Sequence, residues 1–443
     1  MRKLWILLPV ALGLHAQQDP RALARSILQE LIGINTTDSV GDNTAAAEAT
    51  ARRFHDAGYP AADVQVVIPA PKKGNVVVRL RGSGKARPVL FLSHLDVVEA
   101  RREDWSIDPF QLTEKDGYFY GRGTQDIKGD ASLLVANFIR LKRDGFQPER
   151  DLILALTADE EGGRGPNGVG WLLEHRRELI DAEFCVNSDA GGGQAKDGKR
   201  LRYTVQAAEK GYLSFFLRAK NPGGHSSLPI RENAIYELSA ALLKVRDLHF
   251  PLHLNEVTRA YFERTGAFHG EPDRATVARL SASAYENAQL HTTCVATMLR
   301  GGHADNALPQ SAEATVNCRV LPGETQAEVQ ARLAAAVGPG IDITVKIPLA
   351  PNPASPLSPA LMARVEKLVS AAWPGLEVVP VMETGGTDAK PLRGAGIPTY
   401  GISQMFADLD DIRAHGQDER IRTSYYYEGL DFGYTLIREM SRP

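Results

Sequence analysis

The chain has 443 residues, of which 43% are hydrophobic and 24% are charged, with a formal net charge of −3. This composition is that of a globular protein long enough to form more than one domain. The near-neutral charge and the lack of a basic tract argue against a nucleic-acid partner, and no fixed-period repeat or low-complexity segment interrupts the chain.

The N-terminus has the pattern of a signal peptide. Arg2 and Lys3 precede the apolar run LWILLPVALGL, which is too short to span a bilayer but suits the apolar core of a secretion signal. Cleavage after Ala16 would remove residues 1–16 and direct the protein to a secreted or periplasmic location. The alternative is an uncleaved apolar helix. No later segment is apolar for long enough to predict a stable membrane span.

Strand and helix patterns alternate over the first half of the chain. Residues 20–58 carry apolar residues at spacings of three and four, which predicts helix. VQVVIPA, NVVVRLRG, PVLFLSHLDVV, DLILALTADEEGG and AEFCVNSDAGGG resemble strands, and ASLLVANFIRLKRDG is a helix ending at Gly145. This alternation predicts an α/β sheet with helices on both faces and an active site at the carboxyl ends of its strands.

The pattern changes near Lys210. YLSFFLRAK, HTTCVATMLRGG, AEATVNCRVLPG and IDITVKI are predicted strands, and ENAIYELSAALLKVRDL and TQAEVQARLAAAV are predicted helices. Their order is βαββαβ, a ferredoxin-like arrangement, interrupted at 249–290 by a polar, partly helical insertion. After a Pro-rich stretch the α/β pattern resumes. We therefore predict a catalytic domain in two segments, 17–209 and 349–443, with a smaller domain, 210–348, inserted between them.

The three cysteines, Cys185, Cys294 and Cys318, are too few for a disulfide framework. Cys294 and Cys318 lie in two predicted strands and could pair in an oxidising compartment. We favour the simpler reading, in which all three are buried small hydrophobic residues.

Polar clusters occur at the ends of the predicted strands and in nearby loops. They are SHLDVV, GRGTQDIKGD, TADEEGG, NSDAGG and RAHGQDERI. A single histidine is usually structural and adjacent acids usually lie on solvated loops, so each cluster alone is a weak signal. Five clusters at one sheet edge would supply the mixed imidazole and carboxylate ligands that suit a pair of zinc ions. The candidate residues are His94, Asp96, Asp126, Glu160, Glu161, Asp189 and His415.

The spacing of His94 and Asp96 predicts a supporting contact. Residues two apart on a strand point to the same face. Asp96 is therefore placed to accept a hydrogen bond from the second ring nitrogen of His94, which would fix the tautomer of the imidazole and raise its basicity.

In this order the five motifs resemble the co-catalytic zinc peptidase family of aminoacylases, carboxypeptidase S, glutamate carboxypeptidases, dipeptidases and diaminopimelate desuccinylases. The resemblance covers essentially the whole chain after the N-terminal segment. It implies a zinc-peptidase domain with a central mixed sheet flanked by helices, plus an inserted βαββαβ lid domain. The chain departs from the pattern at Asp130, where many relatives have glycine, and in the insertion at 249–290, which leaves substrate and oligomeric state open.

The resemblance also implies a metal site with two Zn2+ per chain, although Co2+ or Mn2+ would fit the same ligands. Asp126 would bridge the two ions, and the peptide bond between Asp126 and Ile127 would be cis. Glu160 would be the general base, and Asp96 would support His94. The other metal ligands would be His94 and Asp189 on one ion, and Glu161 and His415 on the other.

Further residues are implied for substrate binding and catalysis. His225, in NPGGHSSLP, would complete the site as an oxyanion donor, from the same chain or from the other subunit of a homodimer formed through the lid domain. An arginine suits a substrate carboxylate because it can bind both oxygens. The implied substrate contacts are Asn306, Arg319, Gly385, Gly386 and Thr387.

We therefore predict a metal-dependent hydrolase that cleaves an amide bond adjacent to a free carboxylate in short peptides, with carboxypeptidase or dipeptidase action. A first alternative is an N-acyl amino acid amidohydrolase, similar to an aminoacylase. A second alternative is a non-catalytic binding protein on the same fold, which would be expected to have lost Glu160 or a metal ligand.

Overall fold

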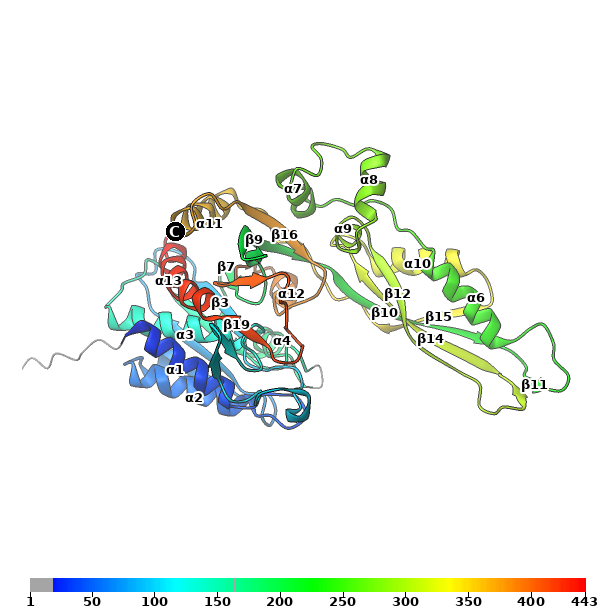
Figure 1. Cartoon of the computed structure of the whole chain (residues 1–443), viewed down its shortest axis with the longest axis horizontal. Coiled ribbons are helices and arrows are strands. Elements are labelled where there is room, and N and C mark those ends of the chain that lie inside the picture. Colours follow the sequence, from blue (N-terminus) through cyan, green and yellow to red (C-terminus); the bar gives the residue numbers. More distant parts are fainter. Residues whose placement is uncertain (1–18, 163–164) are drawn as a thin grey trace, which may run out of the picture.

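The structure, a computed structural model, describes residues 19–162 and 165–443. The chain forms two bodies (Figure 1). The first contains the N-terminal and C-terminal parts of the chain, and the second is an elongated body formed by the middle of the sequence. The predicted α/β fold with an inserted βαββαβ unit is confirmed.

The first body is built on a ten-stranded mixed sheet with the order β1-β2-β6-β3-β7-β17-β9-β8-β18, to which β16 adds by pairing with β9. The central strands β3, β6 and β7 run parallel to one another. Every residue of β3 and β6 is buried, which explains why both strands are apolar until the polar residues at their carboxyl ends. The strands are β1 (Val64–Val67), β2 (Asn75–Leu80), β3 (Val89–His94), β6 (Leu152–Thr157), β7 (Phe184–Asn187), β8 (Gly192–Lys196), β9 (Lys199–Glu209), β16 (Val378–Glu383), β17 (Thr399–Gly401) and β18 (Phe406–Asp408).

Helices cover both faces of this sheet, because alternate residues of the central strands point to opposite sides. Phe91 belongs to the core beneath the first group of helices, whereas Leu90 and Leu92 belong to the core beneath the second. The first group is α1 (Pro20–Gly33), α2 (Asn43–Asp56), α3 (Lys128–Arg143), α11 (Pro359–Ala372) and α13 (Thr423–Met440). The second group is α4 (Gly168–His175), α5 (Arg177–Ile180) and α12 (Ala389–Gly394).

A small three-stranded sheet brings two distant loops together. Its strands are β4 (Thr113–Lys115), β5 (Tyr118–Tyr120) and β19 (Arg420–Arg422), in the order β19-β5-β4. Because β5 precedes GRGTQDIKGD and β19 follows HGQDE, their antiparallel pairing places these two motifs side by side.

The second body is a four-stranded antiparallel sheet, ordered β12-β14-β10-β15, with α6 and α10 packed on it. Its core contains Leu213, Phe215 and Leu217 of β10, facing Leu238 of α6 and Leu333 of α10. The main elements are β10 (Gly211–Lys220), α6 (Ala234–Arg246), β12 (Thr293–Gly301), β14 (Ser311–Val320), α10 (Gln326–Val337) and β15 (Ile341–Ile347). A short pair, β11 (Gly224–His225) and β13 (Ala307–Leu308), forms the tip farthest from the first body (Figure 1).

The insertion at 249–290 is helical and contacts the first body. It consists of α7 (Glu256–Arg264), α8 (Arg274–Ser281) and α9 (Ala284–Leu290) around a small core of its own. Arg264 Nη1 donates to the Val378 carbonyl at 2.6 Å, and Gln289 Nε2 donates to the Met382 carbonyl at 2.8 Å. The insertion, which the sequence order assigns to the second body, therefore packs against β16 of the first.

The cysteines differ from the favoured prediction. Cys294 and Cys318 form a disulfide, while Cys185 is buried and free. The two paired residues lie directly opposite each other on β12 and β14, with their Cα atoms 4.1 Å apart. The expectation of three buried thiols was wrong because the pairing depends on strand register, which the cysteine count does not reveal.

No helix in the described part of the chain combines the length and apolarity needed to cross a bilayer. The predicted signal peptide, residues 1–16, lies outside the described residues.

Candidate metal centre

The polar clusters converge at one edge of the large sheet. His94 is the last residue of β3, Glu160 follows β6, and Asp189 follows β7. Since these three strands are parallel neighbours, their carboxyl ends meet at this edge. Asp126 comes from the loop before α3, and His415 from the loop before β19.

Asp126 joins the two histidines. Its Oδ1 lies 3.2 Å from His94 Nε2, and its Oδ2 lies 3.0 Å from His415 Nε2. Asp189 Oδ1 lies 3.7 Å from His94 Nε2, and Glu161 Oε1 lies 2.8 Å from His415 Nε2. The cluster therefore has two halves that share one carboxylate.

Three overlapping groups in this cluster could each hold a metal ion, with their ligand atoms within 4.8 Å of one another. They are His94, Asp126 and Asp189; Asp126, Glu161 and His415; and His94, Glu160 and Glu161. Imidazole nitrogens mixed with carboxylate oxygens suit zinc and similar transition metals. The residues fit two ions that share Asp126.

The electrostatics of the cluster favour bound cations. Burial and the neighbouring Asp189 carboxylate raise the pKa of Glu160 to about 10, and burial raises the pKa of Asp189 to about 7. Burial opposes ionisation of Asp126 as well, but His415 and His94 hold its pKa well below the usual range. Divalent ions would offset the repulsion among these acids and stabilise their ionised forms.

His94 is held by a backbone group rather than by the predicted carboxylate. Its Nδ1 lies 3.0 Å from the carbonyl oxygen of Asp96, and 3.7 Å from the carboxylate Oδ1 of the same residue. The other carboxylate oxygen of Asp96 accepts a hydrogen bond from Glu161 N at 2.8 Å. Asp96 therefore links His94 to the loop that carries Glu160 and Glu161.

The loop that carries Asp126 is fixed by Glu419, a buried residue to which the sequence reading gave no role. Its carboxylate accepts hydrogen bonds from the backbone N–H groups of Gly123, Gln125 and Asp126, at 3.0, 2.6 and 3.0 Å. Arg122 Nη1 donates to the same carboxylate at 2.6 Å. Arg122 lies in the motif GRGTQDIKGD, and Glu419 lies in RAHGQDERI. Their closeness in sequence to Asp126 and His415 was the one feature from which a supporting role could have been predicted.

Gln125 connects this loop to the one that carries His415. Its side-chain oxygen accepts from the backbone N–H groups of Arg413 and Ala414 at 2.8 and 2.9 Å, and its Nε2 donates to the Arg420 carbonyl at 2.8 Å. The peptide bond between Asp126 and Ile127 is cis, as predicted.

Two further buried acids border the site and were not singled out from the sequence. Asp159, which precedes Glu160, has φ +66°, and its carboxylate pairs with Lys73 and accepts from Gly165 N. Asp388 accepts from the Thr157 hydroxyl at 2.7 Å. In the sequence, Asp159 differs in no way from the other acids of TADEEGG, and Asp388 is simply the residue after Thr387. Neither position therefore suggested a role.

The predicted substrate contacts are dispersed. Gly385 and Gly386 are exposed in the loop after β16. The hydroxyl of Thr387 accepts from Asn187 Nδ2 at 3.1 Å and donates to Glu209, and Asn187 in turn accepts from Asp189 N. Thr387 therefore lies beside the metal cluster, but its hydroxyl is already engaged.

The remaining candidates lie on the second body. Arg319, on β14, lies over the Tyr212 ring at 4.8 Å, close to the junction with the first body. His225 and Asn306 lie at the opposite end, where Ser226 N donates to the Asn306 carbonyl, and both are exposed. Within one chain, β11, which ends at His225, lies far from β3 and β7, the strands that lead to His94 and Asp189 (Figure 1).

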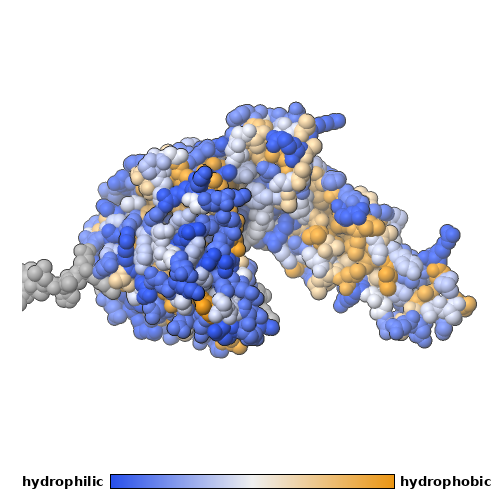
Figure 2. All heavy atoms as spheres, viewed as in Figure 1, coloured by the Kyte–Doolittle hydropathy of each residue, from blue (hydrophilic) through white to orange (hydrophobic). Residues whose placement is uncertain are grey.

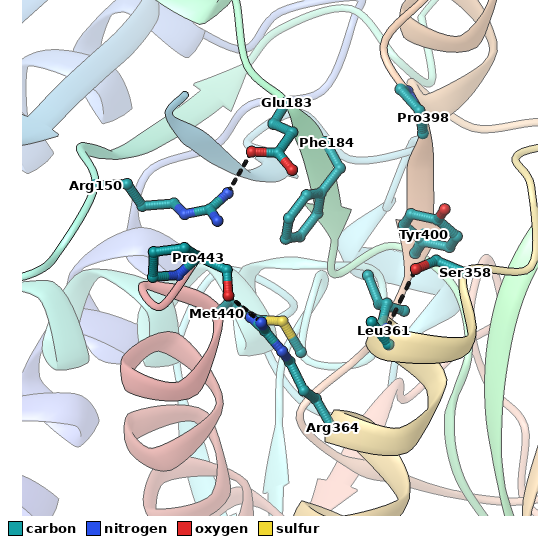
Figure 3. A pocket seen from close by; sticks show the side chains of 11 residues that line it. Arg150, Glu183, Phe184, Ser358, Leu361, Arg364, Pro398, Tyr400, Met440 and Pro443 are labelled. Atoms are coloured by element: carbon teal, nitrogen blue, oxygen red, sulfur yellow. Dashed lines mark hydrogen bonds and ion pairs between the residues drawn. The ribbon is translucent and has the colours of Figure 1, made fainter. Parts of the chain in front are cut away.

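A separate cavity of about 360 Å³ lies between α11, α13 and the sheet (Figure 3). Arg150, Phe184, Arg364 and Tyr400 are among its lining residues, and the Arg150 guanidinium is paired with Glu183 at 2.7 Å. None of the residues that line it belongs to the metal cluster. This cavity is therefore distinct from the candidate site.

Comparison with known proteins agrees with this geometry. The sequence profile of peptidase family M20/M25/M40 matches residues 90–439. The chain is 27% identical over 374 residues to the human N-fatty-acyl-amino acid synthase/hydrolase PM20D1, covering 80% of this chain and 74% of that protein. It is 28% identical over 383 residues to the probable carboxypeptidase S-like 2 of Dictyostelium discoideum, covering 80% and 72%.

Among solved structures, the fold is similar to that of the M20 family metallo-carboxypeptidase Sso-CP2 from Sulfolobus solfataricus. The TM-score is 0.72 with 15% sequence identity, and the match covers 94% of this chain and 99% of that one. At this identity the likeness supports the fold.

Proposed function

This chain belongs to peptidase family M20/M25/M40 and is a hydrolytic enzyme, and from that premise we propose that it cleaves an amide bond adjacent to a free carboxylate. The observation that carries the proposal is the meeting of His94, His415 and four carboxylates, of which Asp126 contacts both histidines. Short peptides are the first substrate class, by carboxypeptidase or dipeptidase action. N-acyl amino acids are the second, supported by the likeness to PM20D1.

We assign the metal pair as two Zn2+, with Co2+ or Mn2+ as ions the same ligands would accept. Asp126 would bridge them, His94 and Asp189 would hold one ion, and Glu161 and His415 would hold the other. The distances between these side chains support this division. When bound, the ions would polarise the amide carbonyl and lower the pKa of a water molecule.

Glu160 is the general base and acid. It takes a proton from the attacking water and then donates that proton to the nitrogen of the leaving amine. Burial and the Asp189 carboxylate raise the pKa of Glu160 in the metal-free chain, and bound cations would lower it toward the range of a general base. Asp96 keeps His94 and the Glu160–Glu161 loop in place through its carbonyl and carboxylate.

We assign recognition of the substrate carboxylate to the loop of Gly385, Gly386 and Thr387 together with Arg319, and to Asn306 of a second copy of the chain, because Asn306 lies beside His225 at the tip of the second body. The glycines are exposed beside Thr387, which is connected through Asn187 to Asp189. Arg319 supplies a guanidinium near the junction of the two bodies, where a cation can bind a carboxylate through both oxygens.

We assign residues 17–209 and 349–443 to the catalytic domain, and 210–348 to a lid through which two copies form a dimer. β12 is an edge strand whose Val295, Met298 and Leu299 are 59%, 63% and 64% exposed. Tyr236 and Leu243 on α6 add to this apolar surface, part of which is visible in Figure 2. An apolar face beside an open strand edge suits a second copy of the chain, which would supply His225 to the site.

The last part of the proposal concerns the location of the protein, which we infer to be exported. Residues 1–16 have the composition of a signal peptide, and the disulfide between Cys294 and Cys318 is of a kind that persists in oxidising compartments. We therefore assign the mature enzyme to a secreted or periplasmic location.

The test is release of free amine from a panel of dipeptides, longer peptides and N-acyl amino acids by zinc-loaded protein. We expect release that a chelator abolishes and zinc restores, and the members consumed distinguish peptidase from aminoacylase action. If no member is cleaved while two equivalents of metal are bound, the non-catalytic alternative replaces the enzyme.

A further inference from the structure

A hollow of about 220 Å³ lies directly beside two of the proposed ligands, Asp126 and Asp189. Much of its wall is apolar. Ile127, Met405 and Ile421 are buried in that wall, whereas Ile412 is 61% exposed at the rim. The hollow is therefore a mostly apolar space in direct contact with the metal cluster, and the assignments above leave it without a role.

The charges of the hollow exclude a carboxylate. Among the described residues, no lysine or arginine lines it. Its acid outside the ligand set, Asp130, is buried, and both carboxylate oxygens are occupied, by the Ser403 hydroxyl at 2.7 Å and by Gln404 N at 2.8 Å. Apart from the proposed metal ions, a substrate carboxylate placed here would find no cationic side chain, and it would lie against the Asp130 carboxylate. The end of the substrate that carries the carboxylate must therefore lie elsewhere.

We propose that this hollow is the subsite for the acyl side of the substrate, and that it takes an uncharged, apolar acyl group. This inference rests on the amide hydrolysis proposed above. A free α-ammonium group suits the hollow poorly. The apolar wall would desolvate the ammonium, the proposed metal ions would neutralise Asp126 and Asp189, and each carboxylate oxygen of Asp130 already accepts a hydrogen bond. The preferred substrates are then N-acyl amino acids, or peptides whose N-terminus is blocked, rather than free dipeptides.

The volume sets the length of the acyl chain. A methylene group is similar in size to a water molecule, whose share of liquid volume is about 30 Å³, so the hollow holds roughly seven such groups. Each buried methylene should raise kcat/KM by about fourfold. We expect the gain to continue to about eight carbons and then to level off.

One pair of probes isolates the effect of charge. N-hexanoyl-phenylalanine and norleucyl-phenylalanine differ only by the α-ammonium group of the second compound. With the zinc-loaded, full-length protein, we expect kcat/KM to be at least about tenfold higher for the hexanoyl compound, given the cost of burying an unpaired charge. A preference for the norleucyl compound would overturn the assignment.

Two substitutions test the location of the subsite. Ile412→Ser removes an apolar group from the rim, and Ala407→Trp narrows the hollow at an exposed position of β18. Both should lower the ratio of N-octanoyl to N-acetyl kcat/KM by about tenfold, the scale of one or two buried methylenes. Leu409→Ser is the matched control, since Leu409 is 38% exposed nearby but does not line the hollow; it should leave the ratio unchanged.

The outcomes separate the subsite from the proposed function. Hydrolysis with no dependence on chain length would overturn the subsite and leave amide hydrolysis standing. If no compound is cleaved, amide hydrolysis fails, and calorimetry on the zinc-loaded protein then tests the subsite alone. Tighter binding of N-octanoyl- than N-acetyl-phenylalanine, weakened by Ile412→Ser, would support it, and equal affinities would overturn it.

Discussion

At the scale of single residues, the site depends on side chains whose charges would be unfavourable without their partners. Asp126 contacts both histidines, and Glu160 lies among acids that raise its pKa. Substitutions that keep the shape of a side chain but remove its charge can test the role of Glu160 and of Glu419, which holds the Asp126 loop.

Glu160→Gln keeps the volume of the side chain but removes the group that accepts a proton. We expect kcat to fall by about a hundredfold or more, the scale of an essential general base, while two equivalents of metal still bind. Kinetics combined with metal analysis of the same sample provides the check. Activity close to that of the unsubstituted protein would remove Glu160 from this role.

Glu419→Gln tests the residue that holds the Asp126 loop. The amide retains one acceptor oxygen, but its NH2 group faces backbone donors and leaves Arg122 without a counter-charge. We expect metal affinity to fall by about 10- to 100-fold, as when groups supporting metal ligands are removed.

Competition with a chelator, performed where circular dichroism shows both proteins to be folded, measures this change. Glu174→Gln is the matched control, because the Glu174 side chain is 77% exposed. Equal metal affinities for Glu419→Gln and Glu174→Gln would mean that Glu419 has no positioning role.

The pKa shifts predict that the metal-free protein becomes less stable as pH rises. The Asp126 and Glu161 carboxylates raise the pKa of His415 from 6.5 to about 10, and burial raises that of Glu160 from 4.5 to about 10. For each group, the lower pKa is that of the unfolded chain and the higher pKa is that of the folded chain. At a pH above the lower pKa the folded chain binds more protons than the unfolded chain, so stability declines as pH rises. The contribution of His415 is complete below about pH 6.5 and is lost through about pH 10.

We therefore expect the Tm of chelator-treated protein to fall between about pH 6.5 and 10. Zinc-loaded protein should show a shallower fall, because metal would replace the proton on His415 and its charge would favour the ionised form of Glu160. Thermal unfolding followed by circular dichroism tests this, and Glu160→Gln should also flatten the metal-free curve. A metal-free Tm that rises over this range would contradict the assigned shifts.

At the scale of elements, the strands of the first body end where the ligands are needed, and the small sheet of β4, β5 and β19 brings the other two ligand loops to them. The insertion α7–α9 does not position ligands but connects the two bodies. It belongs in sequence to the second body, yet α7 and α9 bond to β16 of the first. It therefore braces the junction between the two bodies.

Arg264→Ala tests this brace. The substitution removes the hydrogen bond to the Val378 carbonyl and the ion pair with Glu366. Because fewer contacts then hold the insertion, we expect limited proteolysis within residues 265–273 to become severalfold faster. Arg274→Ala, at the exposed start of α8, is the control and should leave the rate unchanged. Equal rates for the two variants would show that Arg264 does not restrain the insertion.

At the scale of the whole molecule, His225 lies at the tip of the second body, far from the metal cluster of its own chain (Figure 1). The exposed apolar residues of β12 and α6 lie on the same body. A dimer would cover this surface and could deliver His225 to the site of the other copy, as symmetric interfaces do reciprocally.

Mixing two inactive variants tests this exchange. His225→Ala and Glu160→Gln each disable a different half of the site. If His225 acts across the dimer, subunit exchange in an equimolar mixture should restore about a quarter of the wild-type activity, because half the dimers are mixed and each has one intact site. Sedimentation should show a species of twice 48.2 kDa. A folded dimer whose mixture stays inactive would contradict the transfer.

Much of the fold and the site could be predicted because the relevant signals are local. Apolar periodicity identified the buried strands β3 and β6 and the helices of the βαββαβ unit. The order of short motifs pointed to His94, Asp126, Glu160, Glu161, Asp189 and His415 as candidates, and the structure brings them together because strand ends place polar residues at one sheet edge. The cis bond at Asp126 followed from the family resemblance rather than from any local rule.

What the sequence determined by itself is therefore which residues meet in the candidate metal cluster and the type of each main element, since both are encoded within a few consecutive residues. The tertiary structure alone decided which groups support those ligands and which distant residues meet. The Glu419 contact with the Asp126 loop, the pairing of Cys294 with Cys318 and the separation of His225 from its own site are of this kind. These features depend on strand register and on contacts between segments up to several hundred residues apart, which no local pattern records.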